Sequence, residues 1–279
     1  MVIIKKIGND SRIPFINSDG IKIYYETEES GQPIVLVHGF SSDLNSWKGT
    51  SWVKTLKDKY QVIMLDCRGR GKSDKPHEFI KYSLKAMNSD LIKLLDHLSI
   101  KKANFFGYSM GAALVFQLLL QEPKRFISAI LGGFVLNFLK DEVERNRIRD
   151  NVNKRIATLK AESIELIKDP MEHAFRQLSE ATGNDLIALA AASGAVLHYP
   201  TDWEAHPEQT KKLLKRNRIP ILTAVGSNDF PSADKTLVAR VVKNACHFQI
   251  YGKNHMNMLK APQLKMMVKA FLNDVNTKG

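Results

Sequence analysis

One serine in the sequence has the setting of a nucleophile. Ser109 lies at the centre of Gly107-Tyr108-Ser109-Met110-Gly111, which fits the G-x-S-x-G pattern of a nucleophile elbow. In such an elbow a sharp turn from a strand into a helix exposes the serine oxygen, and glycines are needed where the two backbones touch. Ser109 is therefore the candidate nucleophile, and Gly107 and Gly111 are the expected elbow glycines.

A serine nucleophile also needs a base and an acid that orients the base. Asp229 follows the apolar run 219–226, and His255 lies in the loop after the run 246–251. Ligands of open α/β sheets bind at the carboxyl ends of the strands, so Ser109, Asp229 and His255 are predicted to meet there. The chemistry that such a group performs is acyl transfer through a covalent intermediate.

Two backbone N–H groups are candidates for the oxyanion hole. Met110 directly follows the candidate nucleophile, at the positive end of the helix expected after it. Phe40 follows the buried run 33–37 and the pair His38-Gly39, in which Gly39 permits a tight turn beside the sheet. We expect both N–H groups to face the substrate oxygen.

Two other histidines compete with His255 for the role of base. His38 lies at the end of a strand, where a histidine more often holds a loop together by hydrogen bonds, and we expect that structural role. His247 lies within the predicted strand 246–251, further from Ser109 than a residue in the loop beyond that strand. His255 is therefore the preferred base.

The elements that position these residues alternate along the chain. Short apolar runs predict strands at 13–16, 21–25, 33–37, 62–65, 103–106, 126–131, 219–226 and 246–251. Apolar residues at spacings of three and four, or all round, predict helices at 83–98, 112–120, 238–244 and 262–273. This alternation predicts an α/β fold with a mostly parallel central sheet flanked by helices.

The alternation stops after Gly133. From 134 to 218 only helical patterns occur, including an almost entirely apolar stretch at 184–195 that is typical of a sandwiched helix. We therefore predict an all-helical cap, residues 134–218, inserted into a core made of residues 1–133 and 219–279. Such a cap would close a pocket above the candidate nucleophile and exclude water.

Length and composition narrow the class of protein. The 279 residues, of which 44% are apolar, fit one large α/β domain with an insertion. The first residues lack the pattern of a signal peptide, and no apolar run is long enough to cross a membrane, so we expect a soluble, cytoplasmic protein without a membrane partner. Cys67 and Cys246 show no metal-binding spacing, and we expect reduced, buried thiols and no metal.

The net charge of +12 raises the question of a nucleic-acid partner. The densest basic cluster, residues 211–218, lies on one predicted helix and its exit, and no aromatic residue interleaves with it. A solvated helix face is therefore expected, and no nucleic acid. The loop 66–74 lacks both common phosphate-binding patterns, so we expect Asp66 and Arg68 to clamp this loop.

Taken together, these motifs resemble the α/β-hydrolase superfamily, in its capped, esterase-like and haloperoxidase-like branch. The resemblance runs from about residue 21 to residue 272. It is carried by the oxyanion loop His38-Gly39-Phe40, the loop Asp66-x-Arg68-Gly69-x-Gly71-x-Ser73, the elbow from Gly107 to Gly111, the acid in Gly226-x-x-Asp229, and the base His255. A serine at the elbow tells against the dehalogenase and epoxide-hydrolase branches, whose nucleophile is a carboxylate.

The resemblance implies a serine hydrolase that cleaves a small or medium carboxylic ester through an acyl-enzyme. Ser109 would be the nucleophile, His255 the base and Asp229 the residue that orients it, with no cofactor or metal. The expected partner is a small acyl substrate, and the expected assembly is a monomer or a homodimer. A carbon–carbon bond hydrolase, a lactonase and a non-catalytic ligand-binding relative remain open as alternatives.

Overall fold

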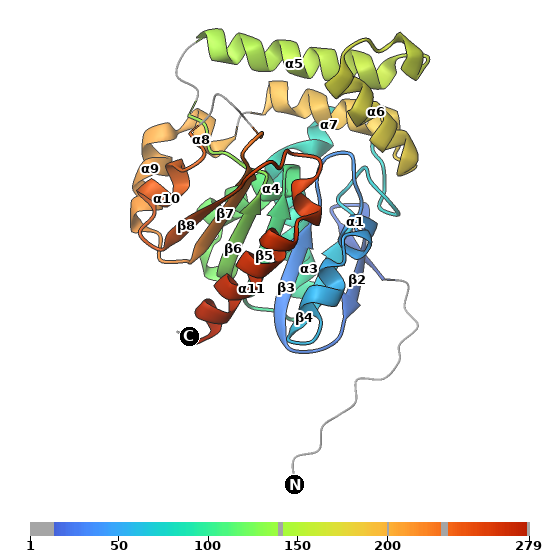
Figure 1. Cartoon of the computed structure of the whole chain (residues 1–279). Helices are drawn as coiled ribbons and strands as arrows, with labels where there is room; N and C mark the ends of the chain where they lie inside the picture. Colours follow the sequence, from blue (N-terminus) through green and yellow to red (C-terminus); the bar gives the residue numbers. More distant parts are fainter. Residues whose placement is uncertain (1–13, 139–141, 200, 230–233, 278–279) are drawn as a thin grey trace.

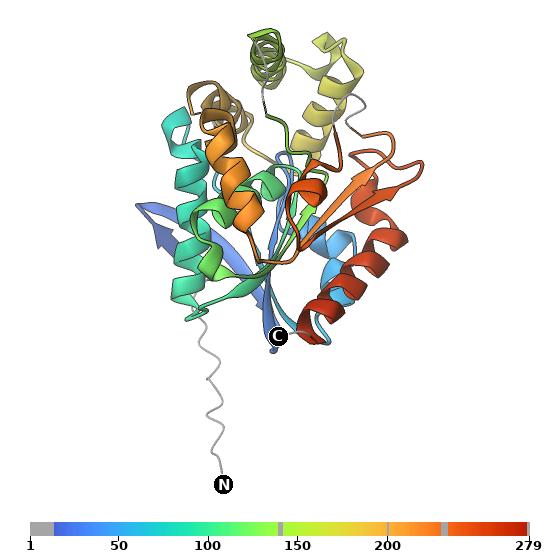
Figure 2. The same cartoon turned by 90° about the vertical axis from the view of Figure 1, so that its left-hand side faces the viewer.

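A computed structural model describes residues 14–138, 142–199, 201–229 and 234–277. Within these ranges a sheet runs through the molecule and helices cover both of its faces (Figure 1, Figure 2). The strands are β1 (Phe15–Ser18), β2 (Ile21–Glu28), β3 (Gln32–Val37), β4 (Tyr60–Leu65), β5 (Ala103–Tyr108), β6 (Phe126–Gly132), β7 (Ile221–Gly226) and β8 (Ala245–Ile250). Ile13, which the sequence places in the first strand, lies outside the described residues.

The order of the strands brings the loops after several of them to one edge. It is β1-β2-β4-β3-β5-β6-β7-β8. The pairs β1–β2 and β2–β4 are antiparallel, and every pair from β4 to β8 is parallel. The predicted α/β fold with a mostly parallel sheet is confirmed. The loops that leave β3, β5, β7 and β8 therefore all emerge at the carboxyl edge.

The central strands are apolar throughout because helices cover both faces of the sheet. All six residues of β5 are buried, and successive side chains point to opposite faces. Phe105 joins one core cluster, whereas the ring of Phe106 packs 4.9 Å from that of Trp47 and 4.7 Å from that of Trp52. One face carries α3 (Leu84–His97), α4 (Met110–Gln121), α9 (Pro207–Arg216) and α10 (Leu237–Val241), and the other carries α1 (Asn45–Gly49), α2 (Trp52–Leu56) and α11 (Pro262–Thr277).

Three helices lie above the carboxyl edge of the sheet, at the top of Figure 1. These cap helices are α5 (Glu142–Lys160), α6 (Pro170–Ala181) and α7 (Leu186–His198), and α5 packs against both α6 and α7. Asp169 and Asp185 begin α6 and α7, since each carboxylate accepts two backbone N–H groups of the first turn. The helical content predicted for this region is therefore observed.

The sequence-based picture of the cap differs from the structure in two places. The stretch 184–195 forms most of α7, but Ile187 and Val196 are 55% and 51% exposed, so this helix is not covered on all sides. After the short helix α8 (Asp202–Ala205), α9 lies beside the sheet, where Leu214 is buried in the same cluster as residues of α4. The segment 134–218 thus includes a helix that packs on the core.

Two glycines in helices should respond differently to substitution by alanine, because only the one at the elbow is in close contact with another backbone. A Cβ atom on Gly111 would lie 2.0 Å from the Val37 carbonyl oxygen, whereas one on Gly194 of α7 would have Phe79 Cβ as its nearest neighbour at 3.8 Å. We expect Gly111→Ala to lower the free energy of unfolding by at least about 2 kcal/mol, because backbone must move. Gly194→Ala should leave it unchanged or raise it by up to about 1 kcal/mol. Urea denaturation measures both, and equal effects would contradict this account.

Candidate active site

Ser109 lies in the turn between β5 and α4 with a backbone conformation that serine seldom adopts. Its φ is 55° and its ψ is −117°, a strained combination for a residue with a side chain. The turn is held because the Ser109 N–H donates to the carbonyl oxygen of Gly132 at 2.8 Å. A Cβ atom on Gly107 would lie 2.3 Å from the Gly111 carbonyl oxygen, so only glycine fits there. The sequence therefore folds into an elbow that exposes the serine side chain.

The structure brings Ser109, His255 and Asp229 into one hydrogen-bonded chain. Ser109 Oγ lies 2.8 Å from His255 Nε2, and His255 Nδ1 lies 3.1 Å from Asp229 Oδ2. Asp229 is only 4% exposed, whereas His255 remains partly accessible. The three residues come from the loops after β5, β7 and β8, as the sequence predicts. A carboxylate, an imidazole and a hydroxyl in this order can move a proton from the hydroxyl to the ring.

The loops that carry Asp229 and His255 are fastened to each other through backbone. A Cβ atom on Gly226 would lie 2.1 Å from the Lys253 carbonyl oxygen, and the Asn228 N–H donates to that same oxygen at 3.0 Å. Asn254, immediately before the histidine, closes the next turn by accepting from the N–H groups two and three residues later, at 3.1 and 3.2 Å. The separation between acid and base is thus set by the backbone.

Tyr108 supports His255, and the sequence analysis missed this role. Its hydroxyl donates to the His255 carbonyl oxygen at 2.5 Å, and the two rings lie 5.6 Å apart. Burial raises the pKa of Tyr108 well above its ordinary value, so the hydroxyl keeps its proton. No sequence signal marks this tyrosine, because it occupies a variable position of the elbow pattern.

His38 has the loop-holding arrangement expected for it. Its Nδ1 lies 2.8 Å from the Gly39 carbonyl oxygen, and its Nε2 lies 3.0 Å from the Cys67 backbone nitrogen, from which it must accept a proton. Both ring nitrogens are therefore engaged with backbone. The Gly39 carbonyl and the Phe40 N–H belong to one planar peptide, so this contact also orients that N–H. Burial lowers the pKa of His38 to about 4.

His247 does not join the group around Ser109. It lies within β8 opposite Thr223, and its Nδ1 is 2.9 Å from the Thr223 hydroxyl oxygen. The histidine in the loop beyond the strand, rather than the one inside it, therefore reaches the elbow.

The two expected oxyanion donors flank Ser109. Met110 is the first residue of α4, and its N–H therefore has no carbonyl partner within that helix. A Cβ atom on Gly39 would lie 3.5 Å from Ser109 Cβ, which places the loop carrying Phe40 beside the serine. Arg70, a residue the sequence analysis did not single out, donates from Nε to the Phe40 carbonyl oxygen at 3.0 Å. The donor roles themselves stay predictions.

Two cavities open at Ser109. The first chamber has a volume of about 290 Å³ and lies under the cap helices, where Ile148, Val152 and Val196 line it. The second chamber, of about 270 Å³, extends towards α1 and the short helix η4 (Met258–Lys260). Phe40, Phe175 and Ser109 line both chambers, so the serine stands where the two meet.

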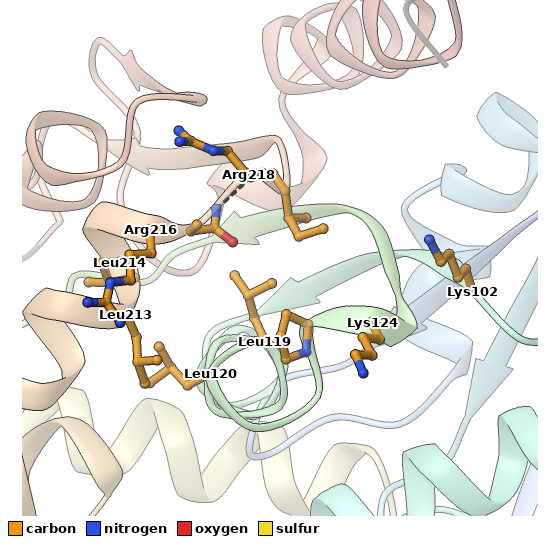
Figure 3. A pocket seen from close by; sticks show the side chains of 11 residues that line it. Lys102, Leu119, Leu120, Lys124, Leu213, Leu214, Arg216 and Arg218 are labelled. Atoms are coloured by element: carbon orange, nitrogen blue, oxygen red, sulfur yellow. Dashed lines mark hydrogen bonds between the residues drawn. The ribbon is translucent and has the colours of Figure 1, made fainter.

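A third cavity lies at the opposite edge of the sheet, near the amino ends of β5 and β6 (Figure 3). It has a volume of about 400 Å³, and the cations Lys102, Lys124, Arg216 and Arg218 line it together with apolar residues of α4 and α9. Figure 3 shows that the charged ends of Lys124, Arg216 and Arg218 point in different directions. The last two belong to the basic cluster 211–218, and their charged ends do not converge on one point.

The described residues place limits on two other kinds of site. Among them, no group of three or more histidines, cysteines, aspartates and glutamates is arranged to hold a metal ion. None of the helices in these parts of the chain is long and apolar enough to cross a membrane. The expected absence of metal and of a membrane partner stays a prediction.

Comparison with known proteins identifies the fold. A family model described as alpha/beta hydrolase fold matches residues 32–146. An uncharacterized hydrolase of Bacillus subtilis, YugF, is 36% identical over 115 residues, which are 40% of this chain and 41% of that protein. The chain thus spans less than half of this curated relative.

Solved structures cover almost the whole chain. One from a study of carboxylesterases of Nitrososphaera gargenis is 19% identical, has a TM-score of 0.76, and covers 95% of this chain and 100% of that chain. The enol-lactonase of Burkholderia xenovorans LB400 is 21% identical, has a TM-score of 0.69, and covers 93% and 100%. At these sequence identities the structural likeness shows the fold alone.

The burial of His38 predicts a loss of stability in mild acid. The folded chain protonates His38 only below about pH 4, whereas an unfolded histidine takes up a proton near pH 6.5. The unfolded state therefore binds more protons between these values, and stability falls as the pH falls. From about pH 7 to about pH 5, wild type should lose about 2 kcal/mol more free energy of unfolding than His38→Gln. Urea denaturation at both pH values measures this, and equal losses in the two proteins would contradict it.

Proposed function

We propose that this chain, which has the α/β-hydrolase fold, is a serine hydrolase that cleaves small or medium carboxylic esters. The observation that carries the proposal is the hydrogen-bonded chain from Ser109 Oγ through the ring of His255 to Asp229. The strained backbone of Ser109 supports it, since strain of this kind persists where the surroundings enforce it and where function uses it.

In the proposed acylation step, Ser109 attacks the ester carbonyl carbon while His255 Nε2 accepts the hydroxyl proton. A bond forms between Ser109 Oγ and the carbonyl carbon, and the carbonyl oxygen takes the electron pair as an oxyanion. When the tetrahedral intermediate collapses, the bond to the alcohol oxygen breaks and His255 gives its proton to that oxygen. Asp229 keeps the ring oriented and stabilises its charged form.

The N–H groups of Phe40 and Met110 are the proposed oxyanion donors. Removal of a single donor of this kind costs about 3 kcal/mol of transition-state stabilisation in well-studied hydrolases. His38 and Arg70 would act here as positioning residues, because they fix the carbonyl groups on either side of Phe40. A fixed donor costs no reorganisation at the moment of reaction.

Water completes the proposed reaction. His255 removes a proton from a water molecule, whose oxygen attacks the acyl carbon, and the bond to Ser109 Oγ then breaks as the serine regains the proton. The proposed cap over the carboxyl edge would limit the entry of bulk water to this step. The reaction so written needs no cofactor and no metal.

A lactonase is the second candidate. A lactone is an ester whose alcohol stays tethered to the acyl group, so the same residues would perform the same bond changes. The structural likeness to an enol-lactonase supports the fold for this chemistry, and the two chambers at Ser109 leave room on both sides of the reacting carbon. Turnover of open-chain esters would favour the ester hydrolase, and its absence would favour the lactonase.

Removal of the nucleophile should abolish turnover. We expect Ser109→Ala to lower kcat for p-nitrophenyl butyrate by at least about 10⁴-fold, because no other hydroxyl can form the acyl-enzyme. Hydrolysis of p-nitrophenyl esters from acetate to decanoate measures the rate, and circular dichroism checks the fold. The elbow turn relies on the serine backbone, so the variant should fold. A folded variant that retains the wild-type rate would overturn the proposal.

Loss of the charge on Asp229 should slow the reaction without abolishing binding. Asp229→Asn is expected to lower kcat by about 10³- to 10⁴-fold, since an amide favours the wrong tautomer of His255. Asp234→Asn is the matched control, because Asp234 pairs with Arg240 at the surface. The p-nitrophenyl butyrate assay compares both variants. Similar rates for the two would reject Asp229 as the orienting acid.

A further inference from the structure

The two chambers that meet at Ser109 differ in whether they contain the proposed base. Ser109, Phe40 and Phe175 line both of them. His255 lines the second chamber and does not line the first. This asymmetry distinguishes the two halves of an ester, because only one half receives a proton from the histidine.

Proton delivery places the alcohol half of the substrate. When the tetrahedral intermediate collapses, the alcohol oxygen takes the proton from His255 Nε2 and must lie within hydrogen-bond reach of it. The alcohol half therefore extends into the second chamber, which His255 lines. The acyl half stays bonded to Ser109 and occupies the first chamber under the cap.

The first chamber suits an apolar acyl group. Ile148, Val152 and Val196 line it together with Phe175, and its polar lining residues besides Ser109 are Asn151, Ser193 and Arg155. Its one cation, Arg155, is paired with Glu172 through two contacts at 2.5 and 2.8 Å, so its charge is already balanced. Apolar walls around a volume of about 290 Å³ fit a short or medium hydrocarbon chain.

The second chamber is also lined by apolar side chains, among them Leu178, Met256 and Leu259, but it differs from the first in its hydroxyl groups and its cation. The hydroxyl groups of Ser42, Ser46 and Thr50 line it. Those of Ser46 and Thr50 donate to backbone carbonyls at 2.7 and 2.6 Å, which leaves oxygen lone pairs to accept from a ligand. Lys260 of η4 also lines this chamber and forms no ion pair with the described residues. No aspartate or glutamate lines the chamber.

We propose that the alcohol half of the substrate combines an apolar body with a negative charge, and that Lys260 is a residue that determines this specificity. The inference rests on the proposed function and adds the class of substrate: esters of an apolar acyl group with an anionic alcohol. The ammonium group attracts the anion near the mouth of the chamber.

Two matched esters test the charge preference. The sodium salt of 4-(butyryloxy)benzoic acid and its methyl ester share the acyl group and the aromatic alcohol and differ in one negative charge. The measured quantity is the ratio of kcat/KM for the charged ester to that for the neutral one, in wild type, Lys260→Met and Lys269→Met. Lys269 lies on α11, is exposed, and lines neither chamber, so it is the matched control.

We expect the ratio to fall at least about threefold in Lys260→Met and to stay at the wild-type value in Lys269→Met. A threefold change lies within the range measured for partly exposed ion pairs. Added salt should lower the wild-type ratio and should have little effect on that of Lys260→Met, because ions screen the attraction.

The same ratio in wild type and Lys260→Met would overturn the proposal, and so would an equal fall in both lysine variants. The proposed function has its own readout, the Ser109-dependent hydrolysis of p-nitrophenyl butyrate. If that ester is hydrolysed and the ratio does not respond to Lys260, only the inference about the alcohol fails. If wild type hydrolyses none of the three esters, the proposed function fails and the inference fails with it.

Discussion

The site depends on three places where backbones touch so closely that only glycine fits. Gly107 meets the carbonyl of Gly111, Gly111 meets that of Val37, and Gly226 meets that of Lys253. The first contact lies within the elbow, the second presses the elbow against the end of β3, and the third joins the loop that carries Asp229 to the loop that carries His255. Because the contacts involve backbone, side-chain adjustment cannot relieve a substitution. They fix the distances on which the proposed proton transfer from Ser109 relies.

Buried polar groups extend this rigidity to the loops after β3 and β4. Asp66 accepts from the backbone N–H groups of Leu44 and Lys72, each at 2.8 Å, and burial raises its pKa. This is the clamp that the sequence predicts. Arg68 differs from that prediction, because its guanidinium forms a buried ion pair with Asp90 of α3, at 2.5 and 2.8 Å. Asp66 therefore ties the loop to Leu44, just before α1, and Arg68 ties it to α3.

The sequence is informative where a local pattern has one structural solution, and less so where side chains meet at long range. The elbow pattern needs a strand, a tight turn and a helix, and the parallel sheet then brings Asp229 and His255 to the same edge. Tyr108 and Arg70 hold backbone carbonyls that only the fold brings near them, so no spacing in the sequence marks them. The exposed face of α7 was missed for a related reason, since an apolar stretch does not tell how many neighbours cover it.

Phe40 links the cap to the chemistry at Ser109. Its ring lies 4.9 Å from the Arg70 guanidinium on the core side and 5.9 Å from that of Arg155 on the cap side. Arg155 is itself 3.8 Å from the ring of Phe175, which lines both chambers. A displacement of α5 would therefore remove contacts from the residue whose N–H is the proposed oxyanion donor. Because Phe40 contacts both arginines, the position of α5 and the arrangement of the loop 38–40 depend on each other.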